Sequence, residues 1–214
     1  MKLYSYFRSS AAYRVRIALN IKGLTYETIS KPLLQGTHRE PDYLALNPQG
    51  LVPALDTGDA VLSQSLAIIE YLDERYPEPP LLPVDPIARA QVRSMAQAIA
   101  CDIHPLNNLR VLNYLRRELK LDDAGVASWY RHWIAEGFRG LEVLARAHSG
   151  DGRFCHGASL TIADVLLVPQ MFNARRFETD LAPFPTLVRI SEHLESLPAF
   201  AKAHPNAQPD ATAS

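Results

Sequence analysis

The apolar residues of the first 80 positions follow two different periods. Short apolar runs, which are typical of strands, are separated by stretches in which apolar residues recur at helical spacing. The predicted strands cover residues 3–7, 24–29, 51–55 and 61–62, and the predicted helices cover residues 13–21, 41–46 and 65–76. This order of elements predicts a small α/β domain in which helices pack against one sheet.

In the second part of the chain the apolar positions keep the helical period, which predicts an all-α region. One stripe covers residues 92–106 and another covers 109–119, and Pro105 predicts a kink or break between them. Thr161 and Asp164 resemble a capping box at the start of a helix. Further helices are predicted over residues 126–144 and 187–194, and residues 208–214 are predicted to be a loose tail.

A proline-rich segment separates the two regions. Five of the 16 prolines lie between Pro77 and Pro86. Proline removes a backbone donor and stops a helix, so this segment is interpreted as a linker. We therefore expect an α/β domain over residues 1–80 and an all-helical domain over residues 86–214.

Composition narrows the class of protein. Of the 214 residues, 47% are hydrophobic and 21% are charged, which is ordinary for a globular protein. The net charge is −1, which gives no overall attraction to nucleic acid or to an anionic membrane surface. No apolar run reaches the ~18 residues of a membrane-spanning helix, and the N-terminus does not resemble a signal peptide. We expect a cytoplasmic protein.

The two cysteines, Cys101 and Cys155, lie far apart and form no CxxC pair. Cys101 is interpreted as a small core residue rather than a redox group. No cluster of His and Cys has the spacing of metal ligands, so no metal site is expected.

The first candidate site lies at the start of the first predicted helix, where Arg8, Ser9 and Ser10 follow a strand. The free N–H groups and the positive dipole end of a helix start favour an anion. A serine hydroxyl adds one more donor. Serine is also a common N-cap, so these residues alone leave capping and anion binding as alternatives.

Gln64 and Ser65 repeat this arrangement before the helix predicted at residues 65–76. Two such starts at one end of a sheet favour an anion-binding cleft more than either does alone. Between them in sequence, Pro53 interrupts an apolar run and should lie at an edge or turn. A cis bond before Pro53 would expose the backbone of Val52 to a peptide-like ligand, but the residues alone leave cis and trans open.

Several segments together resemble the zeta class of glutathione S-transferases, the group that contains the maleylacetoacetate and maleylpyruvate isomerases. The resemblance covers essentially the whole chain, although each segment is a weak signal alone. Ala11 stands where the zeta motif often has a cysteine, which casts doubt on side activities that depend on that thiol. The segments are Ser9-Ser10-x-x-Tyr13-Arg14-Val15-Arg16-Ile17-Ala18-Leu19, Ala45-Leu46-Asn47-Pro48, Val52-Pro53-Ala54-Leu55, Gln64-Ser65-Leu66-Ala67-Ile68-Ile69-Glu70-Tyr71-Leu72, Ala163-Asp164-x-x-Leu167-Val168-Pro169-Gln170 and Gln208-Pro209-Asp210.

The resemblance implies a thioredoxin-like N-terminal domain, an all-helical C-terminal domain, a homodimer, and glutathione as cofactor. It places Ser9 against the glutathione sulfur with Ser10 beside it, and these two serines are the implied catalytic residues. Val52, before a cis Pro53, would pair with the peptide backbone of glutathione. The other implied glutathione contacts are His38 at the glycine end, Gln64 and Ser65 at the γ-glutamyl carboxylate, and His104 and Asn108 from the helical domain.

The implied substrate is a dianionic cis-enedione acid, whose carboxylates favour arginine forks. Arg8, Arg110 and Arg176 are the candidate substrate-binding residues. Without the resemblance, His38 would be interpreted as a solvated loop residue, and His104 and Asn108 as polar residues near a helix kink. Arg14 and Arg16 are interpreted as structural residues that pair with acidic groups within the fold or at the dimer interface.

The implied function is glutathione-dependent isomerisation of maleylacetoacetate in the breakdown of tyrosine and phenylalanine. Maleylpyruvate, from gentisate breakdown, is the alternative substrate. A general transferase would need a broad apolar acceptor pocket, whereas three arginines favour an acidic substrate. A non-enzymatic binding module would be expected to lose the hydroxyl that faces the sulfur, and both Ser9 and Ser10 are present.

Overall fold

The computed structural model describes residues 1–213, and its contacts divide the chain into two compact units. The first unit contains Met1–Pro80 together with the chain from Ser196 onward, and the second contains Leu81–Glu195. The sequence-based division differs from this grouping, because it placed residues 86–214 in one domain. Ser214, the last residue of the predicted tail, lies outside the described residues.

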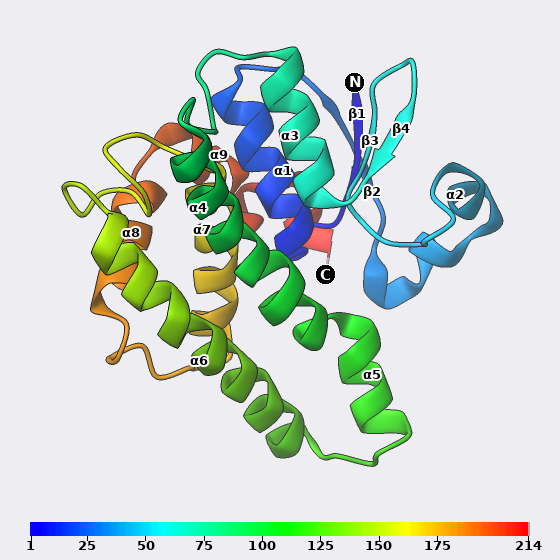
Figure 1. Cartoon of the computed structure of the whole chain (residues 1–214). Coiled ribbons are helices and arrows are strands. Elements are labelled where there is room, and N and C mark those ends of the chain that lie inside the picture. The colour runs from blue at the N-terminus through cyan, green and yellow to red at the C-terminus, as the bar shows by residue number, and fades with distance from the viewer. Residues whose placement is uncertain (214) are drawn as a thin grey trace. The chain divides into compact units, whose positions relative to one another are not determined.

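The sheet of the first unit has four strands in the order β2-β1-β3-β4 (Figure 1). β1 pairs in parallel with β2, and β3 pairs antiparallel with both β1 and β4. Two antiparallel steps restore the original direction, so β1 and β4 end at the same edge of the sheet. The strands are β1 (Lys2–Ser5), β2 (Glu27–Ser30), β3 (Ala54–Asp56) and β4 (Val61–Ser63).

Helices α1 (Ser10–Ile21) and α3 (Ser65–Arg75) pack against each other and follow β1 and β4 directly (Figure 1). Because β1 and β4 end at one edge, both helices start there. The prediction that two helix starts share one end of the sheet is therefore confirmed. The short helix α2 (Pro41–Leu46) lies at its predicted position, and α9 (Pro198–Ala203) packs on α1.

The second unit is all-helical, as predicted. Its apolar stripe breaks at Pro105, where the π-helical turn Ala98–Ile103 leads into the 3₁₀ turn His104–Asn107. Cys101 lies on this π-helical turn and is exposed, so its interpretation as a core residue was wrong. The helices are α4 (Pro86–Gln97), α5 (Leu109–Arg117), α6 (Asp123–His148), α7 (Ile162–Arg176) and α8 (Pro185–Glu195).

Buried carboxylates fix the starts of two of these helices. Asp164 forms the predicted capping box of α7, because its carboxylate accepts from the backbone N–H of Thr161. Glu142 of α6 accepts from the N–H groups of Thr186 and Leu187 at 3.0 Å each and so caps the start of α8. Among residues 1–213, no helix has both the length and the apolar character needed to cross a membrane.

The C-terminal segment is ordered, so the prediction of a loose tail was wrong for residues 208–210. The Gln208 side chain donates to the carbonyls of Lys202 and His204 at 3.0 Å each. Short 3₁₀ turns cover Pro205–Ala207 and Pro209–Ala213. The Asp210 carboxylate also accepts from Phe7 N and Ser30 Oγ, which are 203 and 180 positions away, and local composition does not reveal such bonds.

Candidate functional site

Ser9 is the N-cap of α1. Its hydroxyl oxygen accepts from the N–H of Ala12 at 3.2 Å. Capping uses a lone pair of the hydroxyl and leaves its hydrogen available to donate to a ligand. Capping and ligand binding, which the sequence left as alternatives, are therefore compatible here. Ser10 is buried at the first position of the helix, and the Arg8 guanidinium lies 4.9 Å from the Phe7 ring centre.

The peptide bond between Val52 and Pro53 is cis, as the resemblance implied. Within the described residues, neither the N–H nor the C=O of Val52 has a hydrogen-bond partner. The chain just before it is held firmly, because Leu51 O accepts from Tyr43 Oη at 2.6 Å and from Asn47 Nδ2 at 2.8 Å. An unpaired donor and acceptor on one residue suit an extended peptide ligand.

The start of α3 differs from an ordinary helix start. Gln64, its N-cap residue, has φ of 70° and makes no capping hydrogen bond with its side chain. A non-glycine residue in this left-handed region is strained, and such strain clusters at ligand sites. The Gln64 amide instead donates to Gln49 Oε1 at 2.8 Å. The first-turn N–H groups of α3 therefore remain available to an anion.

Ser65 is buried, and its hydroxyl accepts from Arg14 Nη1 at 3.2 Å. This bond leaves the hydroxyl hydrogen directed away from Arg14 and able to donate to a carboxylate. It also links α1, which carries Arg14, to the start of α3. Arg14 was assigned no place in the site from sequence, and no local signal in the sequence pairs it with Ser65.

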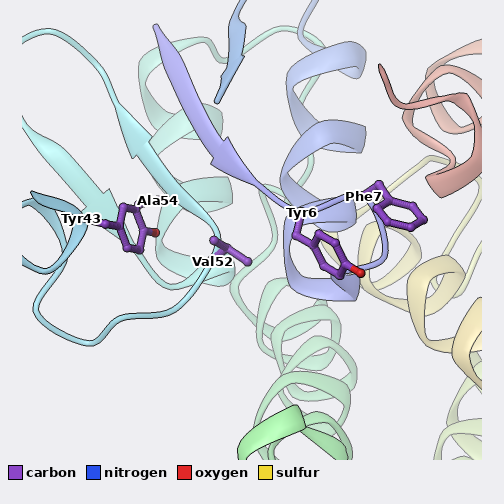
Figure 2. Packing of buried hydrophobic residues seen from close by; sticks show 5 residues of the cluster. All are labelled: Tyr6, Phe7, Tyr43, Val52 and Ala54. Atoms are coloured by element: carbon purple, nitrogen blue, oxygen red, sulfur yellow. The ribbon is translucent and has the colours of Figure 1, made fainter. Parts of the chain in front are cut away.

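A small apolar cluster brings the β1–α1 connection next to the cis-proline loop. Tyr6 and Phe7 pack with Val52, Ala54 and Tyr43 (Figure 2). Ser9 follows Phe7 by two residues, so the cluster places the start of α1 beside Val52. The first unit therefore gathers three of the predicted site features, which are the starts of α1 and α3 and the unpaired backbone of Val52.

His38 lies on the 3₁₀ turn Thr37–Arg39, close to the same loop. Gly50 has φ of 57°, and a Cβ there would lie 3.1 Å from His38 O and 3.0 Å from Leu44 Cδ2. Burial and, to a smaller extent, the charge of Arg39 lower the pKa of His38. The imidazole is therefore neutral at neutral pH.

The other predicted site residues belong to the second unit. Asn108 is the N-cap of α5, and its Oδ1 accepts from the N–H of Arg110 at 3.1 Å. His104 begins the 3₁₀ turn before it, and the Arg110 side chain is exposed. The Arg176 guanidinium lies 5.1 Å from the ring centre of Phe177 at the end of α7. Their roles in a site stay predictions.

One hydrogen bond and one aromatic stack hold this part of the second unit. The amide of Asn107 donates to Tyr130 O on α6 at 3.3 Å. The Tyr130 ring stacks on Phe177 with centroids 3.6 Å apart and planes within 9° of parallel. The segment that carries His104 and Asn108 is thereby connected through α6 to the residue next to Arg176.

Arg16 corrects one interpretation. It is fully buried, but its hydrogen bonds run to Ser5 Oγ and to the carbonyls of Tyr6, Phe7 and Ala203 rather than to carboxylates. Asp210, which appeared only as part of a motif, accepts from the N–H of Phe7. Both residues act on the loop that leads to Ser9, and only the folded chain reveals this.

A thioredoxin-like sheet that carries a cis-proline loop, followed by an all-helical unit, defines the glutathione S-transferase fold. Residues 3–80 match the family model "Glutathione S-transferase, N-terminal domain". A probable maleylacetoacetate isomerase of Vibrio cholerae is 52% identical over 98% of this chain and 97% of its own length. A maleylpyruvate isomerase of a Ralstonia species is 48% identical over 98% of this chain and 99% of its own length.

Solved structures agree. The holo structure of a zeta-class maleylpyruvate isomerase superposes with a TM-score of 0.96 at 48% identity, covering 98% of this chain and 99% of that one. A maleylacetoacetate isomerase of Methylobacterium extorquens AM1, with bound malonate and glutathione, gives a TM-score of 0.94 at 45% identity and covers 99% of both chains. The chain belongs to the zeta class of glutathione S-transferases, the maleylacetoacetate and maleylpyruvate isomerase family.

Proposed function

We propose that this protein is a glutathione-dependent cis–trans isomerase that converts maleylacetoacetate to fumarylacetoacetate in the breakdown of tyrosine and phenylalanine. The observation that carries the proposal is the unpaired backbone of Val52 next to two helix starts. The 52% identical relative from Vibrio cholerae supports this substrate. Maleylpyruvate is the second candidate, because the Ralstonia enzyme is 48% identical over nearly the whole chain.

The residues present fit glutathione in two places. The unpaired N–H and C=O of Val52 match the backbone of a peptide. The uncapped start of α3 and the Ser65 hydroxyl match a carboxylate, and Gln64 lies beside them. We assign the cysteinyl backbone of glutathione to Val52 and its γ-glutamyl carboxylate to Gln64 and Ser65. His38, neutral at neutral pH, is assigned to the glycine end.

Glutathione supplies a thiolate that adds reversibly to the double bond of the substrate, which permits rotation about that bond and leaves glutathione unconsumed. Ser9 stabilises the charged sulfur by donating its hydroxyl hydrogen, with Ser10 beside it. Lowering a thiol pKa of ~8.5 by about two units takes ~2.7 kcal/mol. A helix dipole contributes only ~0.3–1 kcal/mol, and a hydrogen bond to a charged group adds ~1.5–3 kcal/mol. The serine hydroxyl is therefore needed.

The substrate carries two carboxylates, and we assign them to Arg8, Arg110 and Arg176. His104 and Asn108, which belong to the helical unit, are assigned as further glutathione contacts. Malonate in one relative, and dicarboxyethyl glutathione with citrate in another, are acidic ligands bound to those proteins. Arg110→Ala and Arg176→Ala should mainly raise KM for the substrate. If both variants have the KM of the unaltered protein, the assignment to these arginines is wrong.

We also propose that the protein is a homodimer in the cytoplasm. Val84 and Ile87, at the start of α4, are 87% and 71% exposed. A surface hollow of about 480 Å³ lies along the same helix, lined by Arg89, Arg93 and neighbouring residues. A partner copy would cover these groups, and light scattering measures the mass directly. The cytoplasm supplies reduced glutathione.

The function is tested with purified protein, maleylacetoacetate and maleylpyruvate in parallel, with and without glutathione. Turnover that requires glutathione but does not consume it supports the isomerase, and the faster substrate identifies the pathway. Conjugation of a generic electrophile, without isomerisation of either acid, would replace the proposal with a general transferase. Glutathione binding without either reaction would indicate a binding module.

A further inference from the structure

The C-terminal segment returns to the loop that precedes Ser9. Asp210 Oδ2 accepts from the N–H of Phe7 at 3.0 Å and from Ser30 Oγ at 3.0 Å. Figure 2 shows Phe7 beside the C-terminal ribbon. Phe7 and Asp210 are 203 positions apart in the sequence.

A buried cation holds the other side of the same loop. Arg16 Nη2 donates to Phe7 O at 3.0 Å, and Nη1 donates to Ser5 Oγ at 3.1 Å and to Tyr6 O at 3.5 Å. Its Nε donates to Ala203 O at 3.0 Å, at the end of α9. Phe7 therefore has its N–H held by Asp210 and its C=O held by Arg16. Ser9 is two residues further along, and its own N–H donates to Tyr6 O at 2.9 Å.

The part of the chain that presents Asp210 is itself fixed. Gln208, 8% exposed, donates to two carbonyls around the end of α9. Ala211 packs against the cluster that contains Tyr6, Phe7 and Val52. Asp210 is thus carried on an ordered segment and can restrain the loop.

Arg16 and Asp210 carry opposite charges on the two sides of this loop. Burial lowers the pKa of Arg16 to about 10, so the guanidinium stays charged at neutral pH, and Asp210 opposes this lowering. The charged and titratable groups around the loop are Arg8 over the Phe7 ring, Arg16 with Tyr13 and Tyr26 near it, His204 against Tyr13, and Asp210. Because Asp210 offsets Arg16, the hydrogen-bonded clamp adds little net charge near Ser9.

We propose that Asp210, with Arg16, is a positioning residue of the thiolate site, since it fixes the Tyr6–Ser9 loop and so aims the Ser9 hydroxyl at the glutathione sulfur. This inference rests on the proposed function. Asp210 is not assigned any contact with glutathione. The cysteinyl backbone of glutathione is assigned to Val52, and its γ-glutamyl carboxylate is assigned to Gln64 and Ser65. Loss of the clamp should therefore act on the sulfur rather than on glutathione affinity.

The test compares Asp210→Ala with Asp210→Asn in the full-length protein. Asparagine keeps an oxygen that can accept from Phe7 and Ser30, whereas alanine removes it. Ser30→Ala is the matched control, because it removes the other partner of the same oxygen and leaves the Phe7 contact. The readouts are the pH titration of the bound glutathione thiolate, followed by its ultraviolet absorbance, kcat and KM for isomerisation, and amide hydrogen exchange of the Tyr6–Ser9 loop.

Asp210→Ala should raise the pKa of bound glutathione by about one unit and lower kcat at neutral pH roughly tenfold. Its KM for glutathione should change by less than about twofold, and the loop should exchange faster. Asp210→Asn should keep the loop exchange of the unaltered protein, and its thiol pKa should be no higher, because it keeps the acceptor and loses only the negative charge. Ser30→Ala should behave as the unaltered protein. A folded Asp210→Ala variant with unaltered thiolate titration and loop exchange would overturn the inference. If Asp210→Ala does not fold, an Asp210→Asn variant with a raised thiol pKa overturns it, because that variant keeps the clamp.

Failure of the proposed function gives a different result. In that case the unaltered protein itself shows no bound thiolate and no isomerisation. If the unaltered protein is active and Asp210→Ala behaves in the same way, only the proposed role of Asp210 is wrong.

Discussion

The starts of α3 and α7 use similar residues for opposite purposes. At α7, Asp164 is fully buried and accepts from Thr161 N at 2.7 Å, Thr161 Oγ1 at 2.9 Å and Cys155 N at 2.7 Å. At α3, no side chain caps the helix, and Gln64 has φ of 70°. At α7 the chain supplies acceptors for its own helix-start donors, and at α3 no side chain caps the helix.

The difference indicates how to distinguish a helix start that only stabilises the fold from one that can bind a ligand. A serine or threonine at a helix start does not decide the matter, since both starts have a hydroxyl residue nearby. What decides it is whether the chain also supplies the acceptor. The start of α1 lies between the two extremes, because the Ser9 oxygen caps the helix while its hydrogen remains to be donated.

The largest expected effect is a loss of stability at the start of α7, where the chain caps its own helix. Asp164→Ala leaves the buried N–H groups of Cys155 and Thr161 without an acceptor, which should lower the free energy of unfolding by about 2–5 kcal/mol. Asp164→Asn should lose less, because one oxygen remains. Urea unfolding measures both. Glutathione affinity of the folded protein should be unchanged, and a loss of affinity at full folding would break the distinction between the two starts.

Ser9→Ala tests the start of α1. Loss of a hydrogen bond to the thiolate, worth ~1.5–3 kcal/mol, should lower turnover at neutral pH by about 10- to 100-fold. Turnover should partly recover as pH rises, because the thiol then ionises without help. Loss of the cap should cost about 1 kcal/mol of stability. Ser9→Thr keeps the hydroxyl and serves as the control. Unaltered turnover and an unaltered pH profile would leave Ser9 as a cap alone.

Ser65→Ala tests the start of α3, which no side chain caps. It removes the hydroxyl that Arg14 orients and should weaken glutathione binding roughly tenfold, measured by calorimetry. Asp122→Ala is the control, because Asp122 is an exposed cap of α6 that accepts from Gly125 N at 2.8 Å. That variant should lose about 1 kcal/mol of stability and no affinity. Equal affinity losses in both variants would contradict the comparison.

The smallest expected effect is a pH dependence of the free energy of unfolding, caused by His156 near the start of α7. His156 stacks on His148 with centroids 5.3 Å apart and follows Cys155, which Asp164 holds. Burial and then His148 lower the pKa of His156 below 6.5, so the unfolded chain binds more protons as pH falls. The free energy of unfolding should decrease slightly below that pH. His156→Gln should flatten this slope in unfolding experiments, and an unchanged slope would assign it elsewhere.

Sequence patterns predicted much of the fold for a clear reason. The position of α2, the helical break at Pro105 and the capping box of Asp164 depend on residues close together in the chain. The cis bond before Pro53 came from resemblance rather than from periodicity, because local residues do not determine it.

The contacts of the candidate site were harder to predict from the sequence than the fold. The link from Arg14 to Ser65 spans 51 positions and the link from Phe7 to Asp210 spans 203, so neither leaves a local pattern. The strained backbone of Gln64 is also set by its surroundings, since glutamine does not favour a positive φ.

The grouping of the C-terminal segment with the first unit has a consequence for biosynthesis. Asp210 is synthesised 203 residues after Phe7 of the β1–α1 loop, and Ala203 is synthesised 187 residues after its partner Arg16. A protein usually folds domain by domain as it emerges. Here the first unit cannot complete its contacts until Asp210 has been made, and Leu81–Glu195 is synthesised in full before that.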